Sequence, residues 1–192
     1  MSTKTQQVPN GLSLVIDYVN TADRDRETDA ISSPRQLGEW LRSNGLLERG
    51  AAPRLSEGDL RRAVEVREEL RKHMFANNGN VPADWLALDR LACRGRLQVR
   101  FTSGGEAVLE PEAGGLDGAL ARLLVPVALA VQDGSWERVK ACAADDCQWA
   151  FYDRSRNHSG RWCEMAVCGN RKKVRSYRAR AAGDASATDG GG

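Results

Sequence analysis

Apolar side chains recur at helical spacing early in the chain. Ser33 and Pro34 form a typical helix start, because serine is a favoured N-cap and proline a favoured first helical residue. The apolar face that follows carries Leu37, Trp40 and Leu41. The pair Asn44-Gly45 is a typical helix stop, so we predict one amphipathic helix between these signals.

A clearer helical pattern begins at Ser56. Asp59 stands three residues later, in a capping-box arrangement. The stripe that follows consists of Leu60, Ala63, Val64, Arg67, Leu70 and Met74. Arg67 interrupts this stripe with a charge, and Asn77-Asn78-Gly79 ends the helix. A further helix is predicted from about residue 82 to residue 93. Its side chains to be buried are Trp85, Leu88 and Leu91.

Two segments alternate with a period of two, which is typical of strands. The first holds Leu12, Leu14 and Ile16, and it predicts a short strand or a buried extended entry. The second holds Leu97, Val99 and Phe101. A turn at Ser103-Gly104-Gly105 follows it, and Ala107-Val108-Leu109 returns the chain, which indicates a β-hairpin.

Residues 116–131 are strongly apolar and predict a helix that Pro126 should kink or divide. Asp133-Gly134-Ser135 then forms a turn and a boundary. We predict an α+β, mostly helical fold. A helical domain with one β-hairpin would span residues 1–134, and a small module that ends in a basic helix would span 135–181. A disordered tail would occupy 182–192.

The hydropathy pattern argues against a membrane protein. The longest apolar run, from Leu123 to Val131, contains Pro126 and is far shorter than the about 20 residues that a membrane span needs. The first nine residues contain no apolar segment of the kind found in secretory signals. We therefore expect a cytoplasmic protein with reduced thiols and no membrane partner.

Charge is distributed unevenly along the chain. Its 192 residues carry a net charge of only +2. Resolved by region, the net charge is −2 over residues 1–135, +6 over 136–180 and −2 over 181–192. The basic region also holds six of the eleven aromatic residues and four of the five cysteines. We interpret it as a module with its own chemistry.

The cysteines of this module form two close pairs: Cys142 with Cys147, and Cys163 with Cys168. Each pair has the spacing C-x4-C, and fifteen residues separate the pairs. Two pairs joined by a loop are the sequence pattern of a tetrahedral metal site. Four thiolates favour zinc, with an iron–sulfur centre as the alternative. Four sulfur ligands leave no position for a catalytic water, so the site would be structural.

Two further features belong to this interpretation. A zinc ion with four thiolates carries a net charge of −2, so some of the nearby arginines could balance the metal site rather than bind a partner. The fifth cysteine, Cys93, stands at a predicted helix end, where a small core residue is the simplest interpretation.

The residues around the cysteines resemble the CGNR zinc finger. The residues that give this family its name are Cys168-Gly169-Asn170-Arg171. The supporting positions are Phe151, Asp153, Ser155-Arg156-Asn157, Ser159, Arg161-Trp162-Cys163, Met165 and Lys173. The chain departs from the family pattern at Gly160, where an arginine is common. The resemblance covers about 45 residues and implies a bound Zn²⁺.

The N-terminal part resembles the ABATE domain, which commonly precedes this finger. The resemblance rests on Asp17-Tyr18-Val19-Asn20-Thr21, on the helices, on the mid-chain hairpin and on the order of the two parts. It implies a bacterial stress-linked transcription regulator. Asp17, Asn20 and Thr21 could line a ligand pocket, but residues of this kind more often cap a helix or a turn.

The chain after Cys168 predicts a basic helix from about Asn170 to Arg180. Arg171, Arg175 and Arg178 would share one face, whereas Val174 and Tyr177 would pack on the finger. Such a helix could follow phosphates or enter a major groove of DNA, and RNA remains an alternative. The predicted nucleic-acid contacts are Arg154, Arg156, Arg161, Arg171, Lys172, Lys173, Arg175, Arg178 and Arg180.

Other functions compete with DNA binding. His158, Asp153 and Asn157 could hold a second, catalytic metal as in a nuclease. We expect no enzyme, because the module has only one histidine and no paired carboxylates converge recognisably. A redox-sensing or protein-interaction module is the other alternative, because zinc thiolates can be oxidised. Asn170 is expected to cap the local backbone rather than read bases. The aromatic residues expected to form a small core are Trp149, Phe151 and Trp162.

Overall fold

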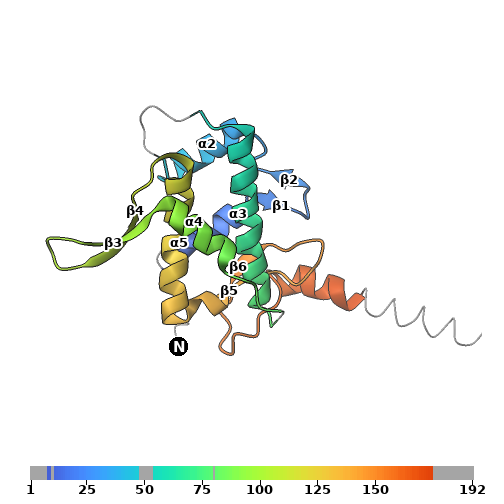
Figure 1. Ribbon diagram of the computed structural model, residues 1–192. Helices are drawn as coiled ribbons and strands as arrows, with labels where there is room; N and C mark the ends of the chain where they lie inside the picture. The colour runs from blue at the N-terminus through green and yellow to red at the C-terminus, as the bar shows by residue number, and fades with distance from the viewer. Residues whose placement is uncertain (1–7, 10, 48–53, 80, 175–192) are drawn as a thin grey trace, which may run out of the picture.

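The structure is a computed structural model that describes residues 8–9, 11–47, 54–79 and 81–174. Two long helices, α3 (Glu57–Ala76) and α5 (Gly115–Asp133), run through the body, and α4 (Leu86–Gly95) packs against both (Figure 1). The shorter α1 (Leu12–Val19) contacts the same two long helices, and α2 (Pro34–Ser43) packs on α3. These helices enclose the main hydrophobic core of the described residues.

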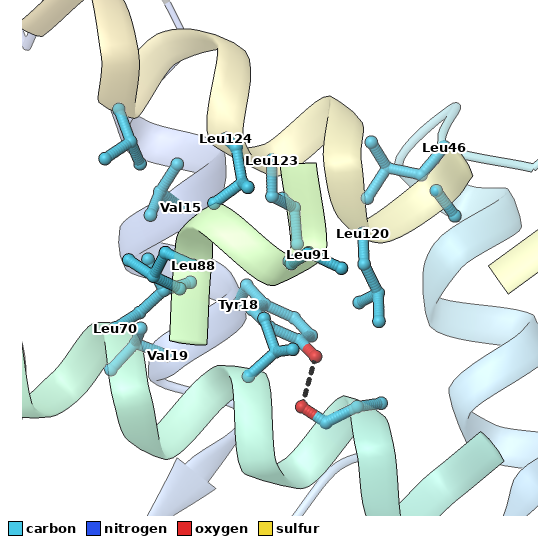
Figure 2. Packing of buried hydrophobic residues seen from close by; sticks show 14 of the residues in the cluster. Val15, Tyr18, Val19, Leu46, Leu70, Leu88, Leu91, Leu120, Leu123 and Leu124 are labelled. Carbon is cyan, nitrogen blue, oxygen red and sulfur yellow. Dashed lines mark hydrogen bonds between the residues drawn. The ribbon is translucent and has the colours of Figure 1, made fainter. Parts of the chain in front are cut away.

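The core is built mainly from leucines around one tyrosine (Figure 2). The side chains of Leu70, Leu91 and Leu120 are almost completely buried, and each contributes about 1.5–3 kcal/mol to folding by leaving water. The hydroxyl of Tyr18 lies among them and donates a hydrogen bond of 2.6 Å to the carbonyl of Ala63 in α3. Burial raises the pKa of Tyr18, so this phenol stays protonated.

The N-terminal segment forms a helix, so the predicted strand or extended entry over residues 12–16 was wrong. Its buried residues are Leu12, Val15, Tyr18 and Val19, which follow helical spacing. Residues 14 and 16 are apolar as well, and such a dense apolar run does not distinguish a period of two from one of 3.6. Packing of α1 against α3 and α5 selects the helix.

The predicted helix starts are confirmed for α2 and α3. Ser33 accepts a hydrogen bond from the backbone N–H of Gln36. Ser56 and Asp59 form both bonds of the capping box. The third helix begins at Leu86, later than predicted, with Trp85 at its N-cap position. The carboxylate of Asp84 accepts the N–H of Leu86 just before the helix.

Helix α4 also extends two residues beyond its predicted end, to Gly95. A Cβ atom at this position would lie 2.2 Å from the Cβ of Ala121 in α5. The glycine therefore allows the end of α4 to approach α5 closely.

Pro126 does not divide α5, which is a single helix of 19 residues. The proline ring is buried and lies against Gly11 at the start of α1, where an added Cβ would come within 2.9 Å of it. Among the described helices, α5 is long and apolar enough to cross a membrane by length and composition alone. Half of the apolar stretch of α5 is buried within the molecule, as in the central helix of a core.

Three short antiparallel pairs complete the fold. They are β1 (Ala22–Asp23) with β2 (Thr28–Asp29), β3 (Leu97–Phe101) with β4 (Ala107–Pro111), and β5 (Val139–Ala141) with β6 (Ala150–Tyr152). The α+β, mostly helical class and the hairpin over 97–111 are confirmed. The pairs β1–β2 and β5–β6 were not predicted, because strands of two or three residues show no periodicity.

The β5–β6 hairpin joins the helical body rather than standing apart from it. Strand β5 directly follows the short 3-10 helix η1 (Ser135–Arg138). Val139, Ala141 and Ala150 of the hairpin are buried in the same core as the helices. Asn20, at the end of α1, accepts the N–H of Ala150 at 2.7 Å and donates to its carbonyl at 2.9 Å. The proposed division at residue 134 remains a prediction about organisation, whereas the packing is continuous across it.

The C-terminal end of α3 makes a second connection to this hairpin. Asn77 donates to the carbonyls of Trp136 and Val139, each at 2.8 Å, and Asn78 donates to the carbonyl of Ala141. The predicted helix-stop residues therefore also satisfy backbone groups of the C-terminal part.

Two buried arginines of α3 hold the centre of the molecule. Arg67, which interrupts the apolar stripe, forms two hydrogen bonds of 2.8 Å with the carboxylate of Asp29. One turn later, Arg71 donates to the carbonyl of Val19 at 2.6 Å and to that of Gln148 at 2.7 Å. Glu68 pairs with both arginines. The network thereby joins α1, α3, β2 and the turn after β5.

We expect Arg71→Met to lower the free energy of unfolding by about 3–5 kcal/mol, because it leaves buried carbonyls and Glu68 without a partner. Arg24→Met is the matched control, since Arg24 is a more exposed partner of the same Glu68. Its effect should stay below about 1 kcal/mol. Urea unfolding of the metal-loaded protein measures both. Equal losses in the free energy of unfolding would show that burial does not make the contacts of Arg71 more important for stability than those of Arg24.

Candidate metal centre

The four cysteines of the C-terminal part converge. Their Sγ atoms all lie within 4.8 Å of one another. The distance is 3.6 Å from Cys147 to Cys163 and 3.7 Å from Cys163 to Cys168. A tetrahedral ion with bonds of about 2.3 Å places its sulfurs about 3.8 Å apart, whereas a disulfide bond measures about 2 Å. The sulfurs are therefore spaced for a shared metal ion.

The first pair is held by a tight turn. Cys142 follows β5, and the N–H groups of Cys147 and Gln148 both donate to the carbonyl of Ala144. Gln148 takes a left-handed backbone conformation with a φ of 49°. Its carbonyl faces Arg71, so the turn that presents the first two sulfurs is tied to α3.

The second pair lies on a different turn. Cys168 belongs to the π-helix η2 (Met165–Gly169), in which the N–H groups of Cys168 and Gly169 both reach the carbonyl of Glu164. The wider π turn accommodates the long C-x4-C spacing. An added Cβ at Gly169 would lie 2.4 Å from the Sδ of Met165, so this glycine lets η2 close tightly.

The thiols influence one another strongly. A hydrogen bond from Cys163 lowers the pKa of Cys142 to about 5, and the peptide group of Ala144 lowers it as well. Burial and the charge on Cys142 raise the pKa of Cys168 to about 12. Four thiolates so close together need a cation among them, and their sulfur donors fit a soft or borderline metal. The cluster is a metal-binding site.

Aromatic packing around the cluster matches the prediction in part. Trp149 and Trp162 pack against the cysteines. Phe151 is half-buried but does not belong to that group. The small core therefore consists of two tryptophans and the cysteines themselves.

The loop between the two cysteine pairs is held by a buried ion pair. Lys140 donates to the carboxylate of Asp153 at 2.9 Å and to the carbonyls of His158 and Gly160. The same carboxylate accepts the N–H groups of Ser155 and Gly160. A Cβ at Gly160 would lie 2.6 Å from this carboxylate, so glycine in place of the family's arginine fits this close contact.

This loop bears on the proposed second metal at Asp153, Asn157 and His158. Asp153 is engaged with Lys140, while the side chains of Asn157 and His158 are exposed. Within the described residues, the four cysteines are the only cluster of histidine, cysteine and acidic residues placed to hold a metal.

Arg171, the arginine of the CGNR motif, is bound to two carboxylates. It donates to Asp146 at 2.9 Å, beside the first cysteine pair, and to Asp25 at 2.6 Å, in the turn between β1 and β2. The hydrogen bonds that it donates to Asp25 and Asp146 raise its pKa. Its side chain thus joins the finger to the N-terminal part.

The other predicted nucleic-acid contacts are placed differently. The exposed ones are Arg154, Arg156, Arg161, Lys172 and Lys173. Those outside the described residues are Arg175, Arg178 and Arg180. The predicted helix is present over 170–174, and the amide of Asn170 donates to the carbonyl of Ala166, a local backbone contact as expected. Val174 is 48 % exposed, so the expectation that it packs on the finger was wrong. Tyr177 lies outside the described residues.

Sequence reasoning missed Asn20, Arg71 and Asp25 as residues that support the site. A buried charge in α3 was visible only at Arg67, because Arg71 lies beside the apolar stripe. The sequence did single out Asn20 as part of the Asp17–Thr21 segment. It offered two roles for this residue, a cap of a helix or turn and a side chain that lines a ligand pocket. The structure shows that it caps α1 and binds the backbone of β6.

We expect Cys163→Ser to reduce bound metal from about one ion per chain to near zero, because the site loses one of its four thiolates. Cys93 is exposed, so its interpretation as a small core residue was wrong. Because it is also not part of the cluster, Cys93→Ser is the control. Elemental analysis of purified protein gives the stoichiometry, and a chelator should lower the melting temperature of the control to that of Cys163→Ser. Full metal content in Cys163→Ser would contradict the assignment.

Asp153 gives a pH prediction. Although burial alone would raise it, hydrogen bonds from Lys140 and Ser155 lower the pKa of Asp153 to about 2. A carboxyl group whose pKa is lower in the folded state stabilises the fold fully at pH values above its ordinary pKa. This stabilisation is lost as the pH falls through the pKa of the folded state. Asp153→Asn should therefore destabilise by about 3–5 kcal/mol at pH 7 by leaving Lys140 unpaired.

The difference in stability between Asp153→Asn and the natural chain should stay constant from pH 7 to about pH 4 and then shrink toward pH 2. Metal loss at low pH affects both proteins alike, because both keep all four cysteines, and it cancels in the difference. A difference that already disappears between pH 7 and pH 5 would argue against the Lys140–Asp153 pair.

The comparisons with known families agree with this geometry. Residues 138–181 match the CGNR zinc finger, and residues 12–133 match the ABATE family, described as "Putative stress-induced transcription regulator". Both predicted resemblances are confirmed, in the predicted order. No curated protein matches the chain. Because the ABATE match covers more than half of the 192 residues, the chain belongs to the ABATE family and carries a CGNR zinc finger behind that domain.

Proposed function

We propose that this protein is a zinc-dependent, DNA-binding transcriptional regulator of the bacterial cytoplasm. The family description supports a role in transcription, and the cysteine cluster supports a metal-stabilised finger. Zinc is the proposed ion, because four thiolates in tetrahedral spacing suit it and it does no redox chemistry of its own. Elemental analysis of the purified protein distinguishes it from iron.

The observation that carries the proposal is how the positive charge of the C-terminal part is used. In the described part of the chain, Arg138 binds loop carbonyls, Lys140 binds Asp153, and Arg171 binds Asp25 and Asp146, so these three cations serve the fold. Five others have exposed side chains in the described part of the chain. They are Arg154, Arg156, Arg161, Lys172 and Lys173. Exposed positive charge of this kind can attract a polyanion.

These exposed cations come from two elements of the finger. Arg156 and Arg161 lie in the loop that the Lys140–Asp153 pair holds, and Lys172 and Lys173 lie in the helix that leaves η2. Both elements are anchored next to metal ligands, so the metal fixes the positions of the cations. We propose no catalytic role for the finger, because Asp153 is engaged with Lys140.

Two double variants test this function. Arg156→Ala with Arg161→Ala removes the loop cations, and Lys172→Ala with Lys173→Ala removes those of the helix. If all four contact phosphates, each double variant should weaken binding to random duplex DNA. It should also reduce the slope of log K against log salt by about 1.8, since each contact contributes about 0.9. Fluorescence anisotropy over a salt series measures both quantities.

The control is Arg61→Ala with Arg90→Ala, which removes the same charge from exposed positions of α3 and α4. Its slope should equal that of the natural chain. A similar loss of slope in all three variants would show that DNA is attracted to positive charge anywhere on the protein and not to the finger in particular. Chelated protein should bind DNA weakly, and tighter binding to single-stranded RNA than to duplex DNA would change the proposed target.

Redox sensing is a second candidate function. A cleft of about 310 Å³ reaches Cys147, Cys163 and Cys168 from the side of the β1–β2 turn, so small oxidants have access to the sulfurs. The same DNA titration after peroxide treatment distinguishes the candidates. Loss of metal together with loss of DNA affinity would support a redox-controlled regulator, and unchanged binding would exclude this control.

A further inference from the structure

The β3–β4 hairpin projects away from the helical body (Figure 1). Its register pairs Leu97 with Pro111, Val99 with Leu109, and Phe101 with Ala107. Because alternate residues of a strand share a face, all six of these side chains lie on one face, and all six are apolar. Near the tip this face is open to solvent: Val99 is 57 % exposed and Phe101 80 % exposed.

The root of the same face opens into an apolar groove between α4 and α5. The groove has a volume of about 360 Å³, and Leu97 is one of its lining residues. Its other apolar lining residues include Trp85, Leu88, Leu124, Val127 and Val131. Since Leu97 belongs to both features, the apolar surface runs without a break from the groove onto the hairpin. Such a continuous surface is typical of an interaction site.

The outer edge of β3 is free for pairing. Within the described residues, β3 pairs with β4 alone. The N–H of Thr102 bonds to Glu106 and the carbonyl of Arg96 accepts from Glu112, so the even-numbered residues of β3 face β4. The backbone groups of Leu97, Val99 and Phe101 therefore point outward.

The two edges of the hairpin differ. β4 ends in Pro111, which has no N–H, and it lies against α5. β3 has neither proline nor a bulge, two features that usually protect an exposed edge, and Arg100 is its only charged residue. The open edge is therefore the one that borders the apolar groove.

We propose that two copies of this chain associate by antiparallel pairing of their β3 strands, with the two-fold axis at Val99. In this register Val99 pairs with Val99 of the second copy, and Leu97 pairs with Phe101 of the second copy. The two-fold axis repeats the second pair, so there are three pairs in all. Because all three residues have outward backbone groups, each pair can exchange two hydrogen bonds, which gives six in a four-stranded sheet. A register shifted by one residue would oppose groups that already bond to β4.

The same register brings the exposed phenylalanine to the groove. Phe101 of the second copy stands directly opposite Leu97, on the same apolar face, at the mouth of the groove of the first copy. The two-fold axis repeats the contact in the other direction. On the polar face Arg100 comes opposite Gln98 of the second copy, so no like charges meet. A second copy thus supplies both the strand for the edge and the side chain for the groove.

Sedimentation of the full metal-loaded chain over a concentration series tests the proposal. The natural chain should form a dimer. Phe101→Ser should raise the dimer dissociation constant about 100-fold, because each of two buried phenylalanines contributes about tenfold. Leu129→Ser is the control, since Leu129 is 50 % exposed on α5 and does not line the groove. A monomer at the highest soluble concentration, or a dimer insensitive to Phe101→Ser, overturns the proposal.

Cross-linking tests the register. In a Cys93→Ser background, Val99→Cys places two thiols across the two-fold axis, where paired Cα atoms lie about 5.5 Å apart and can form a disulfide. Val108→Cys lies on β4 and on the opposite face, so it should not cross-link. Dimers linked only through residue 99 support the pairing. Equal cross-linking at both positions, or none at 99 in a dimer that forms, contradicts this register.

Discussion

The arrangement of this protein depends on the satisfaction of buried guanidinium groups in α3. A buried arginine is tolerated only where every donor finds an acceptor. Arg71 finds acceptors at the end of α1, in Glu68 and at the carbonyl of Gln148. That last contact fixes the turn that presents two metal ligands. The helical body and the metal centre therefore share one set of hydrogen bonds, and the stability of each contributes to the other.

A second connection runs on the surface of the same region. Arg171 binds Asp146 within the finger and Asp25 in the β1–β2 turn. This explains why the motif arginine is not simply one more cation for a partner. It fixes the start of the helix that carries Lys172 and Lys173. A change in the β1–β2 turn would thus reach the basic helix through a single side chain.

Much of this could be predicted from the sequence, for identifiable reasons. Strong local signals, such as the Ser56 capping box and the 97–111 hairpin, require no tertiary information, and they were correct. The cysteine spacing predicted convergence because a metal demands it. The first helix could not be predicted from a dense apolar run, since its period is ambiguous until α3 and α5 pack on it.

The candidate site shows the same limit. Counting charges located the basic part but could not separate cations used by the fold from those left exposed. That separation depends on Asp25, 146 residues before Arg171 in sequence, and on Asp153 beside Lys140. Long-range pairs of this kind leave no periodic trace in one sequence. Only the three-dimensional arrangement reveals which charges are available.

The bonds of Asn20 to the backbone of Ala150 have a consequence for how this protein can evolve. They bind main-chain atoms, so they depend on the distance between α1 and the finger, while the burial of Ala150 restricts the side chain at that position. These two bonds therefore do not depend on which side chains the finger presents at its exposed positions. An exchange of fingers between relatives would have to preserve this contact with α1.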